Sequence, residues 1–167
     1  MTSQIIESVE GHALRMGRLH PAVVAVLRPH FAEVLDLSTV EVRIHKVCWW
    51  RSTPCIVSRG VIHFAKGVLN STRRWTKGAY DAVYFNLASR SGMARLGHEC
   101  VHVRQWRENP GKMLRQNINA VGRIIAKGDV GEWWESPFEQ EAIAKEAGLR
   151  QYFQDHPTEL LPFRELR

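Results

Sequence analysis

The spacing of hydrophobic residues changes twice along this chain and divides it into three parts. Apolar residues recur every three or four positions, as in amphipathic helices, over residues 3–35 and again over residues 90–154. Between these parts, residues 40–87 contain short stretches in which apolar and polar residues alternate, as in strands with one buried face. The pattern predicts an α+β fold in one domain spanning residues 1–167, with a small mixed or antiparallel sheet packed on a central helix and further helices around it.

The strongest strand signal is the stretch V-E-V-R-I-H-K-V at residues 40–47, where apolar and polar residues alternate strictly. Two shorter strands are predicted at residues 55–57 and 61–65, joined by a hairpin-like turn at Ser58-Arg59-Gly60. Residues 82–87 are a further strand candidate. These stretches supply the strands of the predicted sheet.

Two prolines mark the helix that precedes the sheet. Pro21 suits the first turn of a helix over residues 21–35. Pro29 should kink or split this helix, because its ring clashes with the preceding turn of a continuous helix.

Three long helices are predicted after the sheet. Ser89 or Ser91 is placed to cap the first of them, and Asn109-Pro110-Gly111 is placed to end it. Ser136-Pro137 opens the last one, because serine is a good cap and proline suits the first helical position. The predicted helices cover residues 90–108, 112–127 and 136–154.

The composition is that of an ordinary globular domain, with 44% hydrophobic and 24% charged residues. No apolar run approaches the ~18 residues that suggest a membrane span. The first residues lack the basic start and apolar block of a signal peptide, so we expect synthesis in the cytoplasm. The three cysteines are expected to be free thiols, with Cys100 in the core, although Cys48 and Cys55 could pair across a hairpin.

The net charge of +6 raises the question of an anionic partner such as nucleic acid or a membrane surface. Lys and Arg residues are spread along the chain, with local concentrations at residues 73–77 and 112–127. No zinc-finger or RNA-recognition pattern accompanies them. We therefore interpret most of this charge as solvated surface and do not expect nucleic-acid binding.

The chemistry of the chain is concentrated in His98-Glu99-Cys100-Val101-His102, which has the pattern HExxH. Residues four apart lie on one face of a helix, so His98 and His102 can present two imidazoles to one metal ion. Two zinc-binding histidines with a Glu general base directly after the first of them is the arrangement of many metallopeptidases. The alternative is a solvated histidine pair on an amphipathic helix.

A catalytic zinc ion usually has three protein ligands and keeps its fourth position for water. Glu139 is the leading candidate for the third ligand, because it lies among apolar positions on the last helix, where a carboxylate needs a partner. Ser-x-x-Glu is also a capping box, so Glu139 could instead serve only to start its helix. Glu141 is the alternative ligand, on the other edge of the helix and close to Lys145.

Four stretches in order resemble a bacterial family of HExxH metallopeptidase domains often found with extracellular contractile injection systems, the injection-system core domain. Residues 36–45 (DLSTVEVRIH) are similar to its "DLS-x-VRVH" stretch, and residues 55–64 (CIVSRGVIHF) to its "A-F-T-x-G-x-x-I-x-F" hairpin. Residues 95–105 (RLGHECVHVRQ) are similar to its "LLAHELTHVVQQ" helix. Residues 139–143 (EQEAI) are similar to its "E-x-E-A-D" stretch. The resemblance spans roughly residues 27–146.

The resemblance implies a compact zincin of the kind with a Glu third ligand, in which Zn²⁺ is held by His98, His102 and Glu139 and Glu99 is catalytic. It also implies a peptide or protein substrate, and it raises association with a contractile-injection or secretion system, with export by a route that needs no signal peptide. This chain departs from the family where Ile143 replaces the Asp expected four residues after the ligand Glu. That Asp supports a ligand histidine in related enzymes, so here the histidine has to be oriented by another residue.

The expected activity is hydrolysis of a peptide bond by a water that Glu99 deprotonates. A further donor should stabilise the oxyanion, and the sequence leaves four candidates open. A strand beside the zinc helix could bind an extended substrate, and residues 61–65 are the candidate. The departure at Ile143 allows an alternative, a zinc-binding assembly or interaction module without turnover. The four oxyanion or substrate candidates are His63, Tyr84, Arg95 and Tyr152.

Overall fold

The computed structural model of this chain describes residues 17–45, 55–65, 87, 89–127 and 135–161. Within them the fold is α+β, as predicted, with four helices and one sheet of three strands. Predictions that fall on other residues, among them the strand candidate at 82–86, the basic stretch at 73–77 and Cys48, lie outside the described part. None of the described helices combines the length and the apolar character needed to cross a membrane.

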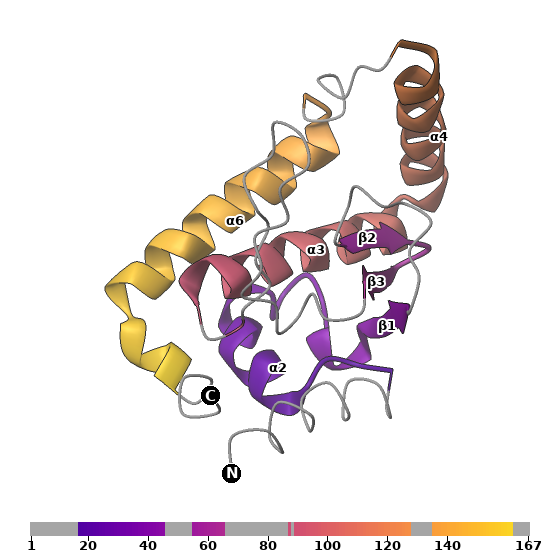
Figure 1. Cartoon of the computed structure of the whole chain (residues 1–167). Helices are drawn as coiled ribbons and strands as arrows, with labels where there is room; N and C mark the ends of the chain where they lie inside the picture. The colour runs from indigo at the N-terminus through magenta and orange to yellow at the C-terminus, as the bar shows by residue number, and fades with distance from the viewer. Residues whose placement is uncertain (1–16, 46–54, 66–86, 88, 128–134, 162–167) are drawn as a thin grey trace.

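Helix α3 (Arg90–Glu108) lies at the centre of the fold (Figure 1). Helix α6 (Pro137–Asp155) runs along one side of it. The sheet and the short helix α2 (Pro21–Leu27) lie on the other side. The helix is buried on both sides, because α6 covers the side that carries the histidines.

The sheet is mixed and small. Its strands are β1 (Glu41–His45), β2 (Cys55–Ser58) and β3 (Val61–Ala65), in the order β1-β3-β2. β1 runs parallel to β3, and β2 runs antiparallel to it. Arg59 and Gly60, with φ angles of 52° and 75°, form the tight hairpin turn that was predicted between β2 and β3.

The position of β3 corrects one expectation. β3 is the central strand, with β1 on one side and β2 on the other. A strand that already pairs on both edges has no backbone groups left for an added strand. Residues 61–65 therefore cannot bind an extended substrate by β-addition.

The helix boundaries follow the sequence signals closely. α2 ends at Leu27 and is followed by a 3-10 turn, Arg28–His30, so the break near Pro29 was predicted, but the helix does not resume over residues 31–35. The Ser89 side chain accepts a hydrogen bond from the Gly92 N–H at 3.0 Å and caps α3. The next helix, α4 (Pro110–Lys127), starts two residues earlier than predicted, because proline is well suited to the first turn.

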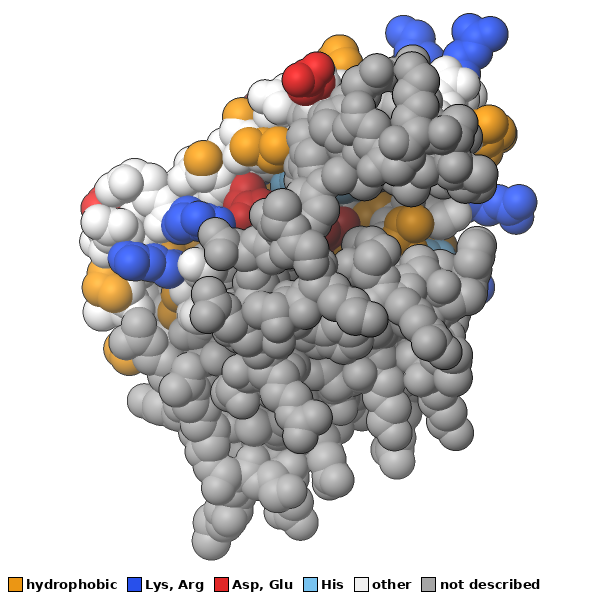
Figure 2. All heavy atoms as spheres, turned by 45° about the horizontal axis from the view of Figure 1, so that its top comes forward, with side chains coloured by type: hydrophobic (Ala, Val, Ile, Leu, Met, Phe, Trp, Pro, Cys, Tyr) orange, Lys and Arg blue, Asp and Glu red, His pale blue; other side chains and the backbone are white. Residues whose placement is uncertain are grey.

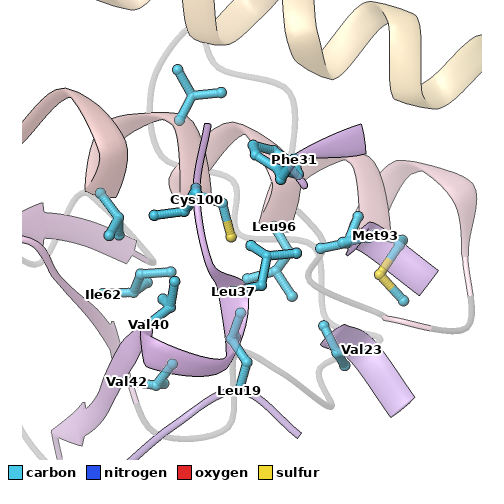
Figure 3. Close-up of a cluster of buried hydrophobic side chains, with 14 of the residues drawn as sticks. Leu19, Val23, Phe31, Leu37, Val40, Val42, Ile62, Met93, Leu96 and Cys100 are labelled. Atoms are coloured by element: carbon cyan, nitrogen blue, oxygen red, sulfur yellow. The ribbon is translucent and has the colours of Figure 1, made fainter. Parts of the chain in front are cut away.

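The hydrophobic core fills the space between α3, the sheet and α2 (Figure 3). Leu96 and Cys100 project from α3 toward Leu37, Val40 and Ile62. Cys100 is thus a buried core thiol, as predicted, and Cys55 is also buried and free.

Helices α3 and α6 approach each other closely at Gly97. A Cβ atom at this position would overlap with the Leu149 Cδ1 methyl and would lie 3.8 Å from Phe31 Cε2. Gly97 immediately precedes His98, so the close contact between the two helices also brings the HExxH motif against α6. A residue without a side chain is needed here because both helices and the core behind them share this space.

Gly97→Ala is expected to lower the free energy of unfolding by about 1–3 kcal/mol, because a methyl group is forced into a filled core. Gly148→Ala is the matched control, since a Cβ there meets no atom within 4 Å. That control should be neutral or stabilise the chain by up to about 1 kcal/mol, because alanine favours a helix. Thermal unfolding followed by circular dichroism measures both, and equal midpoints would contradict the tight contact at Gly97.

Candidate metal centre

Two elements bring three polar side chains together in the interior. α3 supplies His98 and His102, and the first turn of α6 supplies Glu139. His98 Nε2 lies 3.1 Å from Glu139 Oε1, and His102 Nε2 lies 3.2 Å from Glu139 Oε2. The two Nε2 atoms are 3.1 Å apart. His98 and Glu139 are only 1% and 3% exposed, so the cluster has little contact with water.

These separations suit a tetrahedral metal ion. Three donor atoms that each lie about 2.0–2.1 Å from one ion are about 3.3–3.4 Å from one another in tetrahedral geometry. The two Nε2 atoms are 3.1 Å apart, and each lies 3.1–3.2 Å from a different oxygen of Glu139, so the separations are close to that value. The three side chains could therefore hold one ion after small rotations, without any movement of the helices.

The start of α6 places Glu139 where it is needed. The Ser136 hydroxyl accepts a hydrogen bond from the Glu139 N–H at 3.2 Å, as in the predicted capping box. The Glu139 carboxylate lies between the two histidines. Capping and metal binding were considered as alternatives for this segment, and its geometry accommodates both.

Gln105 orients the imidazole of His102 through a hydrogen bond. The Gln105 Nε2 atom lies 2.9 Å from the Phe138 carbonyl oxygen and 2.7 Å from Glu141 Oε2, and both of these atoms can only accept hydrogen bonds. The Gln105 amide is thereby oriented so that its Oε1 faces His102 Nδ1 at 2.8 Å. Nδ1 must then carry the proton, which leaves the lone pair of Nε2 directed at the cluster.

His98 has a corresponding neighbour, Glu146, two turns beyond Glu139 on α6. Glu146 Oε2 lies 3.2 Å from His98 Nδ1. This is an ion-pair distance, although the N–H is not aligned with the oxygen for a full hydrogen bond. Glu146 also binds Arg95 Nη1 at 3.0 Å and Arg150 Nη2 at 2.6 Å. The resemblance leads us to expect a carboxylate at position 143, where this chain has Ile143, and Glu146 is the carboxylate that lies against His98 Nδ1.

The ionisation of these groups is strongly perturbed. Burial acts to lower the pKa of His98, but the contacts with Glu139 and Glu146 outweigh it and raise that pKa to about 9. Burial acts to raise the pKa of Glu139, but its contacts with His102 and His98 hold the pKa well below its usual range. Burial also acts to raise the pKa of Glu146, but its contacts with His98 and Arg95 outweigh it and lower that pKa to about 2. Both carboxylates are therefore ionised at neutral pH.

These contacts define what the cluster can do. A carboxylate and two Nε2 atoms converge on one point, and acceptors on the other side of each imidazole favour a proton on its Nδ1. Lone pairs that converge in a buried site repel one another unless a cation lies between them. Without a metal, a proton on His98 supplies the positive charge between these groups. With a metal, that proton is displaced.

Glu99 lies beside this cluster on the side of the sheet. Its carboxylate is 4% exposed and lies 3.5 Å from Arg95 Nε. It also contacts the Cys55 thiol on β2, and burial together with the charge of Glu99 raises the pKa of that thiol well above its usual value. A neutral thiol and a guanidinium therefore hold the carboxylate in place.

Glu141 is not part of the cluster. It is an exposed residue that forms an ion pair with Arg104, which lies on α3 one turn before Glu108. The second carboxylate oxygen of Glu141 accepts a hydrogen bond from the Gln105 amide. The geometry thus brings Glu139, and not Glu141, to the two histidines.

The other predicted site residues are dispersed. His63 lies on the face of β3 opposite the buried Ile62 and Phe64. Tyr152 donates a hydrogen bond to Glu159 at 2.5 Å, away from the two histidine ligand candidates. Arg95 is close to the cluster but is engaged by Glu99 and Glu146. The fourth candidate, Tyr84, lies outside the described residues.

Two residues of this centre, Gln105 and Glu146, were not predicted to orient the histidines. Gln105 follows His102 by three residues, and Glu146 follows Glu139 by seven, so each shares a helix face with its partner. The spacing of both residues was a usable signal. Figure 2 shows acidic side chains (red) and histidine side chains (pale blue) beside one another on the face drawn.

No protein-family model, curated protein or solved structure matches this chain. Its function therefore has to be argued from the metal centre itself.

Proposed function

We propose that this chain is a zinc-dependent peptidase of the zincin type, with His98, His102 and Glu139 as zinc ligands. The observation that carries this proposal is the convergence of two imidazole nitrogens, 3.1 Å apart, on the two oxygens of one buried carboxylate, each 3.1–3.2 Å from one of the nitrogens. Two imidazoles and a carboxylate form the ligand set of many catalytic zinc sites. The resemblance to the injection-system core domain supports the same ligands.

The chain's own residues divide the work of hydrolysis. When bound, zinc would lower the pKa of a water and polarise the scissile carbonyl. Glu99 would accept the proton of the attacking water and transfer it to the leaving amine. Gln105 would keep His102 in the tautomer whose Nε2 is free to bind. Burial of the cluster would strengthen each of these electrostatic interactions.

One observation favours a second function, a zinc-binding interaction module without turnover. The Glu99 carboxylate is buried and lies near Arg95 and the Cys55 thiol, so a protein that only needs the metal could keep this arrangement. Both functions are compatible with the association with a contractile-injection or secretion system that the resemblance supports. Both functions require zinc binding, and only the peptidase hydrolyses peptide bonds.

The zinc content of purified chain tests the part that both functions share. Wild type is expected to contain about one zinc ion per chain. Glu139→Ala should lose most of it, because one of three ligands is removed. Glu141→Ala is the matched control, since Gln105 keeps its bond to the Phe138 carbonyl when Glu141 is absent. Inductively coupled plasma mass spectrometry gives the content of each.

Two outcomes would contradict this assignment. Wild type that holds no zinc after purification and dialysis against zinc would overturn the proposal. Full zinc in Glu139→Ala together with loss of zinc in Glu141→Ala would show that Glu141 is the third ligand.

A further inference from the structure

A second carboxylate of α6 lies behind the metal centre. α3 and α6 run antiparallel, so that Gln105 meets the start of α6 while Arg95 meets Glu146 further along it. Positions 139 and 146 are seven residues apart and therefore share one face of the helix. His98 lies between them, with Nε2 toward Glu139 and Nδ1 toward Glu146.

We propose that Glu146 is the positioning residue for His98. It lies two turns beyond Glu139 and takes the place of a supporting carboxylate at position 143, where this chain has Ile143. The inference rests on the proposed zinc site. Glu146 would hold the proton of His98 on Nδ1 and so direct the Nε2 lone pair at the zinc ion. It would act on the metal only through His98.

The surroundings of Glu146 fit this role. The oxygen that faces His98, Oε2, also accepts from Arg95 Nη1 at 3.0 Å, and the other oxygen accepts from Arg150 Nη2 at 2.6 Å. Both oxygens are thus held by a guanidinium, one on each side, so the carboxylate has a fixed orientation. Ile143, one turn after Glu139, has an apolar side chain and cannot accept a proton from His98.

Zinc affinity measures the role of Glu146. Glu146→Leu removes the acceptor and is expected to weaken zinc binding about 10–100-fold, the range for partners of ligand histidines. Glu146→Gln keeps an oxygen that can accept from Nδ1, so its loss should be smaller. Asp155→Leu is the matched control, because it removes an exposed carboxylate of the same helix that accepts from Gln151, and it should leave the affinity unchanged. Competition with a chromophoric chelator gives the dissociation constants.

A second readout separates positioning from a general loss of stability. Cobalt(II) replaces zinc in such sites, and its visible absorption depends on the geometry of the ligands. The spectra of Glu146→Leu and Glu146→Gln should differ from wild type in band position, whereas that of Asp155→Leu should not. Far-ultraviolet circular dichroism establishes that each variant is folded.

The outcomes distinguish this inference from the function on which it rests. Wild type that binds zinc, with both Glu146 variants equal to it in affinity and in cobalt spectrum, would overturn the inference and leave the zinc site standing. Wild type that binds neither zinc nor cobalt would overturn both. Weaker binding in the order Leu, Gln, wild type, with altered spectra, supports the role of Glu146.

Discussion

Glu99→Gln is expected to reduce peptide hydrolysis by about 10²–10⁴-fold, the usual contribution of a general base. Glutamine has nearly the shape of glutamate but cannot take a proton from water at neutral pH. The zinc ligands are untouched by this change, so zinc content should stay at the wild-type value. Loss of activity at constant zinc would identify Glu99 as the base.

The measurement needs substrates that assume nothing about specificity. A pool of quenched fluorescent peptides and a denatured protein such as casein serve this purpose, each with zinc-loaded wild type and variant. Glu108→Gln is the matched control, because Glu108 is an exposed carboxylate at the end of the same helix. It should hydrolyse the same peptides at the wild-type rate.

Equal hydrolysis by wild type and Glu99→Gln would overturn the proposal that this chain is a peptidase. If zinc is bound in both, the interaction module without turnover is then the better account. If wild type cleaves and Glu99→Gln does not, the arrangement of Arg95 and Cys55 around Glu99 has to be understood as part of a working site. The side-by-side comparison therefore decides between the two proposed functions.

The parts of this centre that could be predicted are those that depend on local spacing. His98 and His102 are four residues apart, and any helix brings such a pair to one face. The start of α6 could be predicted because Ser136 and Pro137 are placed where a helix cap and a first turn need them. Glu139 was found because a carboxylate in an apolar setting needs a partner.

The parts that could not be predicted depend on how distant segments pair. The antiparallel alignment of α3 and α6 brings Arg95 and His98 to Glu146, and no local pattern specifies that alignment. The central position of β3 results from its parallel pairing with β1, across a connection of many residues. The histidine side of α3 is polar in sequence and yet buried in the fold, because its polar residues there meet polar residues of α6.

Removal of zinc is expected to lower the thermal midpoint of wild type by about 8–16 °C. A ligand present at 1,000 times its dissociation constant stabilises the folded state by about 4.1 kcal/mol. For a chain of 167 residues, each kcal/mol corresponds to about 2–4 °C. The proposed ligands lie on α3 and α6, so these two helices should come apart more readily when no zinc joins them.

The size of this shift should depend on pH, through His98. Its pKa in the folded chain without metal is raised to about 9, from an ordinary value of 6.5. Its proton therefore stabilises the metal-free fold fully below pH 6.5, and this contribution is lost as the pH rises through about 9. Zinc displaces the same proton. The difference in midpoint between zinc and chelator should therefore be larger at pH 9 than at pH 6.

Differential scanning calorimetry with zinc and with EDTA, at both pH values, measures this dependence. Glu139→Ala is the control, because loss of a ligand should make the midpoint nearly independent of zinc at either pH. A zinc-dependent shift that is equal at pH 6 and pH 9 would show that no proton is exchanged for the metal. The ion would then have to bind away from His98, since a buried imidazole between Glu139 and Glu146 cannot give its Nε2 to zinc without releasing that proton.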